Sequence, residues 1–333
     1  MCYHISCTAP LCAKIKKVRR KMKKNYLTQN VFSASVMLLF GALFLIGTFN
    51  DKTIAETLYS PDDLPVKLVT SIGIFPFFEV LVFLFGALFE RALHSDAGKP
   101  AKTTECAVCI LTAAVVGFIG SAAILDVDCF GAIFPTLQRN PLAISLVSLT
   151  VAYPLFFLGY RLARRTDDSL LAKRIVGLVI IMLAAFFTME MIKNIFHRPR
   201  YRTVVLGFEG VGFVPWYKPF SGAAALAESF GIDKGEFRSF PSGHSILSIS
   251  MVYALQSLPW FFPKLNGKAL VLGSVGFAFG AVIMFTRMLL GAHYLSDVSA
   301  GAMIGTLFAL INTMIQWRIS LKSSTEQKEV QHA

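Results

Sequence analysis

Eight apolar segments of nearly membrane-spanning length constrain this chain more than any other feature. A helix needs about 20 predominantly apolar residues to cross the hydrocarbon core of a bilayer. Polar loops with glycine and proline separate the segments. The sequence therefore predicts an all-α fold, a polytopic membrane helical bundle with about eight transmembrane helices. The predicted spans are residues 31–49, 68–92, 106–125, 141–160, 174–192, 245–262, 269–286 and 295–316.

Composition and charge support a membrane protein rather than a nucleic-acid-binding protein. Hydrophobic residues make up 55% of the chain and charged residues only 16%, whereas soluble domains carry about 25% charged residues. The net charge of +12 is concentrated in residues 1–30, which contain no Asp or Glu. A basic segment directly before the first span is typical of the cytosolic side of a membrane protein. The predicted partner is thus the membrane and its anionic headgroups, with no nucleic acid.

Loop charges predict the topology and the division of the chain. The loops after the second and fourth spans are basic, and those after the first and third are acidic or nearly uncharged. This alternation places both termini in the cytosol and residues 193–244 on the extracytoplasmic side. The predicted regions are a basic tail over 1–30, about four helices over 31–172, a core over 173–316 with a long loop at 193–244, and a cytosolic tail over 317–333.

Glycines spaced four residues apart occur in the last two predicted spans. The pairs are Gly276 with Gly280 and Gly301 with Gly305. Small residues at this spacing let helix backbones approach closely within a membrane. Close helix packing is the role that we predict for all four.

Polar residues cluster in three short segments, all at span ends on the predicted outer side. The segments read "EMIKNIFHRPRYR", "FPSGHS" and "FTRMLLGAHYLSDV". Topology predicts that they meet at one end of the bundle. The candidate residues are Lys193 and Arg200 in the first segment, Ser242, Gly243 and His244 in the second, and Arg287, His293 and Asp297 in the third.

The residue types in these segments suit a phosphate group. Lys193, Arg200 and Arg287 supply three positive charges, and the arginine fork matches the geometry of phosphate oxygens. Pro241 to Gly243 precede a predicted helix, whose first N–H groups and positive dipole end favour an anion. The sequence therefore predicts an anion site with a helix N-terminus on one side.

Two histidines add reactive groups to this site. His293 and Asp297 are four residues apart and hence lie on one helix face, where the carboxylate could fix the imidazole tautomer. His244 has no acidic partner nearby in the sequence and could donate a proton to a leaving group.

The three segments together resemble the type 2 phosphatidic acid phosphatase superfamily, whose signature is K-x6-R-P, P-S-G-H and S-R-x5-H-x3-D. Lys193 and Arg200 match the first part, Pro241 to His244 the second, and Arg287 to Asp297 the third. Tyr201 stands where the family has proline, and Thr286 stands where it has serine. Arg198-Pro199 is also an Arg-Pro pair, so either Arg198 or Arg200 could correspond to the arginine of the first motif. The spacing from Lys193 favours Arg200.

The resemblance covers residues 175–316 and implies a fold and a mechanism. It implies a six-helix core, with two further helices before the first motif that have no assigned role. It implies that His293 attacks phosphorus, that Asp297 orients His293, and that His244 protonates the leaving oxygen. Lys193, Arg200, Ser242, Gly243 and Arg287 would hold the phosphoryl oxygens, with no metal and no cofactor.

Several alternatives remain open at this stage. The substrate could be a lipid phosphate, such as phosphatidic acid or phosphatidylglycerol phosphate, or a polyprenyl diphosphate. A phosphotransferase or a non-catalytic lipid or anion transporter could use the same residues. Arg198 and Arg202 are expected either at the entrance of the site or in solvent, and Glu190 could pair with Lys193. A bacterial plasma membrane is the expected location.

Overall fold

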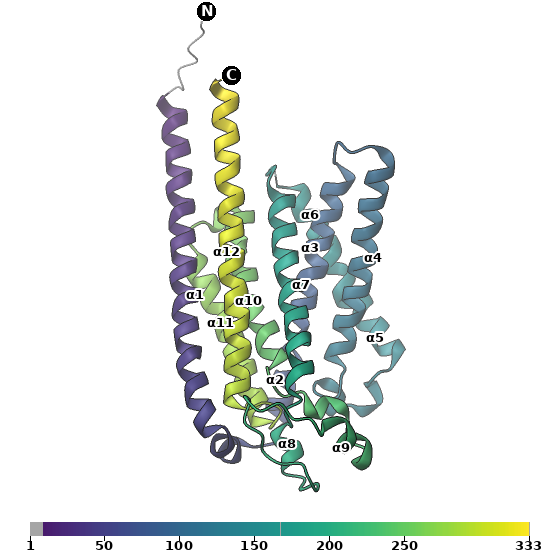
Figure 1. Cartoon of the computed structure of the whole chain (residues 1–333). Helices are drawn as coiled ribbons and strands as arrows, with labels where there is room; N and C mark the ends of the chain where they lie inside the picture. The colour runs from purple at the N-terminus through teal and green to yellow at the C-terminus, as the bar shows by residue number, and fades with distance from the viewer. Residues whose placement is uncertain (1–8, 167, 333) are drawn as a thin grey trace, which may run out of the picture.

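The computed structural model describes residues 9–166 and 168–332, and every regular element in them is helical. The long helices are α1 (Ala9–Leu58), α3 (Phe75–Leu93), α4 (Lys99–Ile124), α6 (Tyr153–Arg164), α7 (Leu171–Phe196), α10 (Gly243–Phe261), α11 (Ala269–Leu289) and α12 (Leu295–His332). They form one elongated bundle (Figure 1). The predicted all-α membrane bundle is confirmed.

Short elements connect these helices. α2 (Leu64–Ser71) precedes α3, and α5 (Pro141–Val147) continues through a π-helical turn, Ser148–Ala152, into α6. Between α7 and α10 lie α8 (Tyr201–Val204), α9 (Ala223–Phe230) and a 3-10 turn, Lys234–Phe237. Further 3-10 turns are Phe130–Ala132, Pro135–Leu137 and Pro263–Leu265.

Seven helical segments of the described chain are long and apolar enough to cross a membrane. They are Lys23–Leu58, Leu64–Leu93, Lys99–Ile124, Pro141–Arg164, Leu171–Val204, Ala269–Leu289 and Leu295–Leu321. The eighth predicted span is present as α10, although it is not apolar enough to be among them. Nearly all of α10 is buried inside the bundle, so its serines and Gln256 face protein rather than lipid.

The first and last helices extend beyond the boundaries that we predicted for the spans. α1 has 50 residues, a length of about 75 Å at 1.5 Å per residue, and thus exceeds the bilayer core. The predicted basic tail is therefore helical from Ala9 on, and residues 1–8 lie outside the described residues. α12 likewise continues through the predicted C-terminal tail to His332. α1 begins and α12 ends at the same end of the bundle, opposite α8 and α9 (Figure 1).

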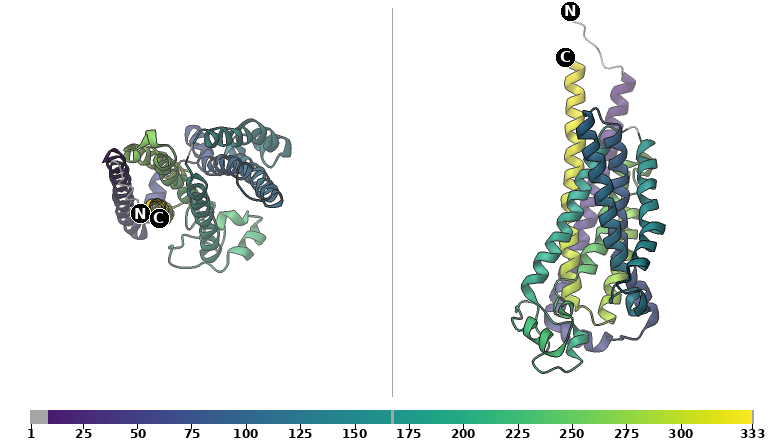
Figure 2. Two further views of the ribbon diagram at one scale, coloured as in Figure 1. Left: turned by 90° about the horizontal axis from the view of Figure 1, so that it is seen from above. Right: turned by 90° about the vertical axis from the view of Figure 1, so that its right-hand side faces the viewer.

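Six of the long helices form the core of the bundle, and α4 and α6 lie outside it. α10 packs against α11, α12, α7 and α3, while α1 packs along α12 and α11. The main contacts of α4 and α6 with the long helices are with α3 and with each other. Seen from above, the helices form two groups with α7 between them (Figure 2). The two helices additional to the six-helix core are therefore α4 and the α5–α6 segment, inserted between α3 and α7.

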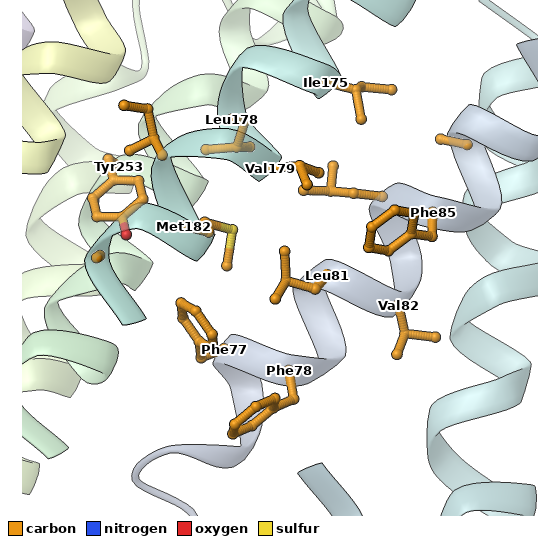
Figure 3. Close-up of a cluster of buried hydrophobic side chains, with 14 of the residues drawn as sticks. Phe77, Phe78, Leu81, Val82, Phe85, Ile175, Leu178, Val179, Met182 and Tyr253 are labelled. Carbon is orange, nitrogen blue, oxygen red and sulfur yellow. The ribbon is translucent and has the colours of Figure 1, made fainter. Parts of the chain in front are cut away.

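Apolar side chains of α3 and α7 join the two groups. Phe77, Leu81 and Phe85 of α3 meet Leu178 and Met182 of α7, and Tyr253 of α10 lies beside them (Figure 3). All six are at most 7% exposed. Large apolar side chains on the outer faces remain exposed, which is expected where lipid replaces water.

The predicted glycine contacts place α10 against both of its neighbours. A Cβ atom on Gly276 of α11 would lie 2.6 Å from the amide nitrogen of Val252. One on Gly301 of α12 would lie 2.6 Å from the carbonyl oxygen of Ser242. Since both neighbours are backbone atoms, they cannot move aside as a side chain could. The glycines therefore set the distance between α10 and its neighbours.

Gly276→Ala should lower the stability of the folded protein by about 1–3 kcal/mol, because the new methyl group overpacks the α10–α11 contact. Thermal unfolding in detergent would measure the loss. Gly41→Ala in α1 is the matched control, since a Cβ atom there has no neighbour within 4 Å. Equal midpoints for the two variants would contradict the assigned role of Gly276.

Candidate functional site

The first segment of the site follows the end of α7. Lys193 lies in the last turn of this helix, and His197 ends it in the left-handed conformation with φ of 47°. Pro199 cannot continue a helix, because it lacks an N–H group and its ring is bulky. The chain therefore turns and places Arg198 and Arg200 at the end of the bundle.

The second segment is the N-terminus of α10. Ser242 is the N-cap, and its side chain accepts a hydrogen bond from the amide of Ser245. A Cβ atom on Gly243 would lie 3.0 Å from Nζ of Lys193, so the lysine ammonium lies directly against this glycine. The Cδ2 atom of His244 lies 3.1 Å from the corresponding position at Gly73, so the turn before α3 encloses the ring. The helix N-terminus and Lys193 thus face the same space.

The third segment is the corner between α11 and α12. Arg287 lies in the last turn of α11 with no exposed surface, and His293 is 2% exposed. Gly291 turns the chain with φ of 61° and lets the amide of Arg202 donate to its carbonyl group at 3.0 Å. The corner therefore docks onto the segment after α7.

All eight predicted site residues come together at this end of the bundle. Arg287, Arg200, Lys193 and His244 all lie close enough to His293 to influence its ionisation. Burial first, and then these neighbouring groups, above all Arg287 and Arg200, hold the pKa of His293 well below its ordinary value. The imidazole is therefore neutral at neutral pH.

His293 is held in one tautomer by a backbone carbonyl group. Its Nδ1 atom lies 2.7 Å from the carbonyl oxygen of Ser239. Because a carbonyl oxygen can only accept, Nδ1 carries the proton and Nε2 has the free lone pair. We predicted that Asp297 would orient the ring directly, but its carboxylate is 3.9 Å from Nδ1. Asp297 instead accepts from the Ser239 hydroxyl group at 2.5 Å and acts through that residue.

Arg198 lies in a buried ion-pair network rather than at an entrance or in solvent. It is 1% exposed and donates to Asp297 at 2.6 Å and to Asp51 of α1 at 2.9 Å. Asp51 also accepts from the amide of Ser296 at 2.9 Å. Our expectation for Arg198 was wrong, because charge and position in the sequence do not reveal a buried partner 147 residues away.

Asp128 is the site residue that sequence reasoning missed. It lies in the loop between α4 and α5 and contacts Arg200 at 2.6 Å, Arg202 at 2.6 Å and Arg287 at 2.9 Å. Burial alone would raise the pKa of Asp128, but the three arginines together hold that pKa well below its ordinary range. The only signal in the sequence was an acidic loop on the predicted outer side.

Glu236 is a second acidic residue in this cluster. It accepts from Nε of Arg202 at 2.9 Å and lies 3.7 Å from Arg200. Arg202 is therefore paired inside the protein rather than free in solvent. Glu190 pairs with Arg238 at 2.6 Å, so its carboxylate contacts that arginine and not Lys193 as we had suggested.

The cluster leaves several buried polar nitrogen atoms without a partner among the described residues. They include Nε of Arg200, Nε of Arg287 and Nε2 of His244. Buried polar atoms are normally hydrogen-bonded, so unpaired donors grouped together indicate a ligand with several acceptors. In the described chain, no group of three or more His, Cys, Asp or Glu side chains is placed to hold a metal ion.

A polytopic helical bundle with buried cations around a histidine defines an integral membrane protein with a positively charged internal cluster. Residues 174–320 match the model of the PAP2 superfamily. This part of the chain is similar to that superfamily, in agreement with the resemblance found in the motifs.

Two curated relatives align with part of the chain. The lipid A 1-phosphatase of Rhizobium etli is 35% identical over 106 residues, which are 32% of this chain and 36% of the relative. The lipid A 1-phosphatase of Rhizobium johnstonii is 34% identical over 106 residues, 32% of this chain and 34% of the relative. The alignment thus spans about a third of the length of either relative. No solved structure matches the chain.

Arg198→Met should destabilise the protein by about 3–5 kcal/mol, because it leaves Asp51 and Asp297 buried without their cation. The free energy of unfolding in detergent measures this effect. Lys52→Met is the control, since the Lys52–Glu56 pair is exposed, 3.8 Å apart and worth less than about 1 kcal/mol. A loss for Arg198→Met no larger than that of the control would contradict the network.

Proposed function

We propose that this protein is an integral-membrane phosphatase that hydrolyses a lipid phosphate through a phosphohistidine intermediate. The observation that carries the proposal is the neutral His293, fixed with Nε2 free and surrounded by Lys193, Arg200 and Arg287. In this proposal His293 is the nucleophile, and the three cationic side chains stabilise the phosphoryl group during its transfer.

The reaction follows from this geometry. Nε2 of His293 attacks phosphorus and forms an N–P bond, while the P–O bond to the lipid breaks. His244 donates a proton to the departing lipid oxygen. Water then attacks the phosphohistidine, His244 takes a proton from that water, and inorganic phosphate leaves while His293 is regenerated.

The chain's own donors hold the phosphoryl oxygens during both steps. The proposed donors are the unpaired Nε atoms of Arg200 and Arg287, the ammonium group of Lys193 beside Gly243 and the first amides of α10. Ser242 fixes the start of α10, because its amide donates to the carbonyl oxygen of Asp297 at 3.0 Å. Asp297 positions the His293 corner through Ser239 rather than by contact with the imidazole.

The active site is proposed to face the extracytoplasmic side of a bacterial plasma membrane. α1 begins and α12 ends at the opposite end, where the sequence carries its basic N-terminal segment (Figure 1). Clusters of Lys and Arg favour the cytoplasmic side of a membrane. The bacterial relatives support this location.

The substrate is proposed to be a lipid with a terminal phosphate. The relatives are lipid A 1-phosphatases by name, which favours lipid A over the other candidates. Phosphatidic acid, phosphatidylglycerol phosphate and undecaprenyl diphosphate belong in the same test panel, because the phosphate site does not distinguish their apolar parts.

His293→Ala should abolish phosphate release from this lipid panel, because it removes the nucleophile. The purified parent should release phosphate in detergent with EDTA present, since the proposed steps use only the chain's own groups. His94→Ala is the control, because His94 is an exposed histidine at the end of α3. Release that persists in His293→Ala, or that stops in EDTA, would contradict the mechanism.

The pH profile gives an independent measurement of His293. Its ordinary pKa is 6.5, and the protein lowers this value, so the free enzyme keeps Nε2 unprotonated well below pH 6.5. His293 should therefore cause no loss of kcat/KM between pH 8 and pH 6.5, once the values are corrected for ionisation of the substrate and of His244, the proposed acid. Arg200→Gln removes one repelling charge and should move the acidic limb toward higher pH. An unmoved limb would show that Arg200 does not act on His293.

A further inference from the structure

The two oxygens of the Asp128 carboxylate have different partners. Oδ1 contacts Arg202, which lies outside the three motifs and is also paired with Glu236. Oδ2 contacts Arg200 at 2.6 Å and Arg287 at 2.9 Å, the two motif arginines. Oδ2 therefore occupies the position between the two guanidinium groups that a phosphoryl oxygen would take.

The Asp128 carboxylate pairs with only some of the hydrogen-bond donors around this position. It leaves Nε of Arg200 and Nε of Arg287 without partners, and His244 keeps an unpaired Nε2 beside the cluster. A terminal phosphate carries a charge of about −1.5 to −2 and has three acceptor oxygens. Such a group could pair with more of these donors than a carboxylate can.

A phosphodiester offers no such advantage. It has one negative charge and two unesterified oxygens, as a carboxylate does. Asp128 is moreover attached to the same chain, so it competes at a high effective concentration. Headgroups of ordinary membrane phospholipids are diesters and greatly outnumber any one phosphomonoester lipid.

We propose that Oδ2 of Asp128 stands in for a phosphoryl oxygen and must be displaced by the substrate, so that Asp128 selects terminal phosphates over phosphodiesters. Displacement removes the contacts of this carboxylate with Arg200 and Arg287, which tie the loop to the end of the bundle. The residue is delivered by the loop between α4 and α5, which belongs to the two helices outside the six-helix core (Figure 1). The inference rests on the proposed phosphate-binding function of the site.

Binding measurements on Asp128→Asn test this proposal without relying on turnover. The thermal unfolding midpoint in detergent would be followed at pH 8 against inorganic phosphate and against dimethyl phosphate, because a ligand of the folded state raises it. The parent should respond to inorganic phosphate and not to dimethyl phosphate. Asp128→Asn should bind phosphate about tenfold more tightly or better and should also respond to dimethyl phosphate.

Glu236→Gln is the matched control for charge. It removes one negative charge from the same arginine cluster, but Glu236 does not lie between Arg200 and Arg287. Equal gains in phosphate affinity for both variants would show an effect of net charge alone and would overturn the proposal. Continued rejection of dimethyl phosphate by Asp128→Asn would also overturn it.

Hydrogen exchange in the unmodified protein tests displacement directly and covers the case in which Asp128→Asn fails to fold. Saturating phosphate should accelerate amide exchange at Cys129 and Gly131, whose N–H groups bond to the carbonyl oxygen of Asp126 in this loop. Slower or unchanged exchange would overturn the proposal. A parent protein that binds no phosphate would refute the proposed function itself. If the parent binds phosphate but Asp128→Asn gains no more phosphate affinity than Glu236→Gln, only the assignment of Asp128 is refuted.

Discussion

The buried ion pairs of Arg198 with Asp51 and Asp297 are the interaction on which the rest of the site depends. They join α1, the segment after α7 and α12, three parts of the chain that are distant in sequence. Asp297 then holds the hydroxyl group of Ser239, whose carbonyl oxygen fixes His293. The position of His293 is therefore coupled to the packing of the first and last helices.

Electrostatic balance explains why so many charges can be buried at one end of a membrane bundle. Lys193, Arg200, Arg202 and Arg287 are offset by Asp128 and Glu236, and the surplus is positive. An isolated buried charge is costly, so a surplus of this kind persists best where an anion can balance it. Burial and, after it, the same surplus hold the pKa of His293 well below its ordinary value.

The helices around the site differ in what they contribute. α7, α10, α11 and α12 carry all eight predicted site residues at their ends or in the loops between them. α1 contributes Asp51, and the inserted α4–α6 segment contributes Asp128. Close glycine contacts hold α10 between α11 and α12, so the start of α10 has a fixed position relative to His293.

The sequence by itself determined the helical spans, the three motifs and the choice of Arg200 by its spacing from Lys193, because these depend on local periodicity and residue chemistry. Only the tertiary structure decided the partners of the charges. Asp51 and Asp128 looked like ordinary loop acids, and Arg198 looked like a solvated or entrance residue. Their roles arise from contacts between charged residues 72 to 159 positions apart, and no local pattern specifies which distant charge a buried carboxylate will meet.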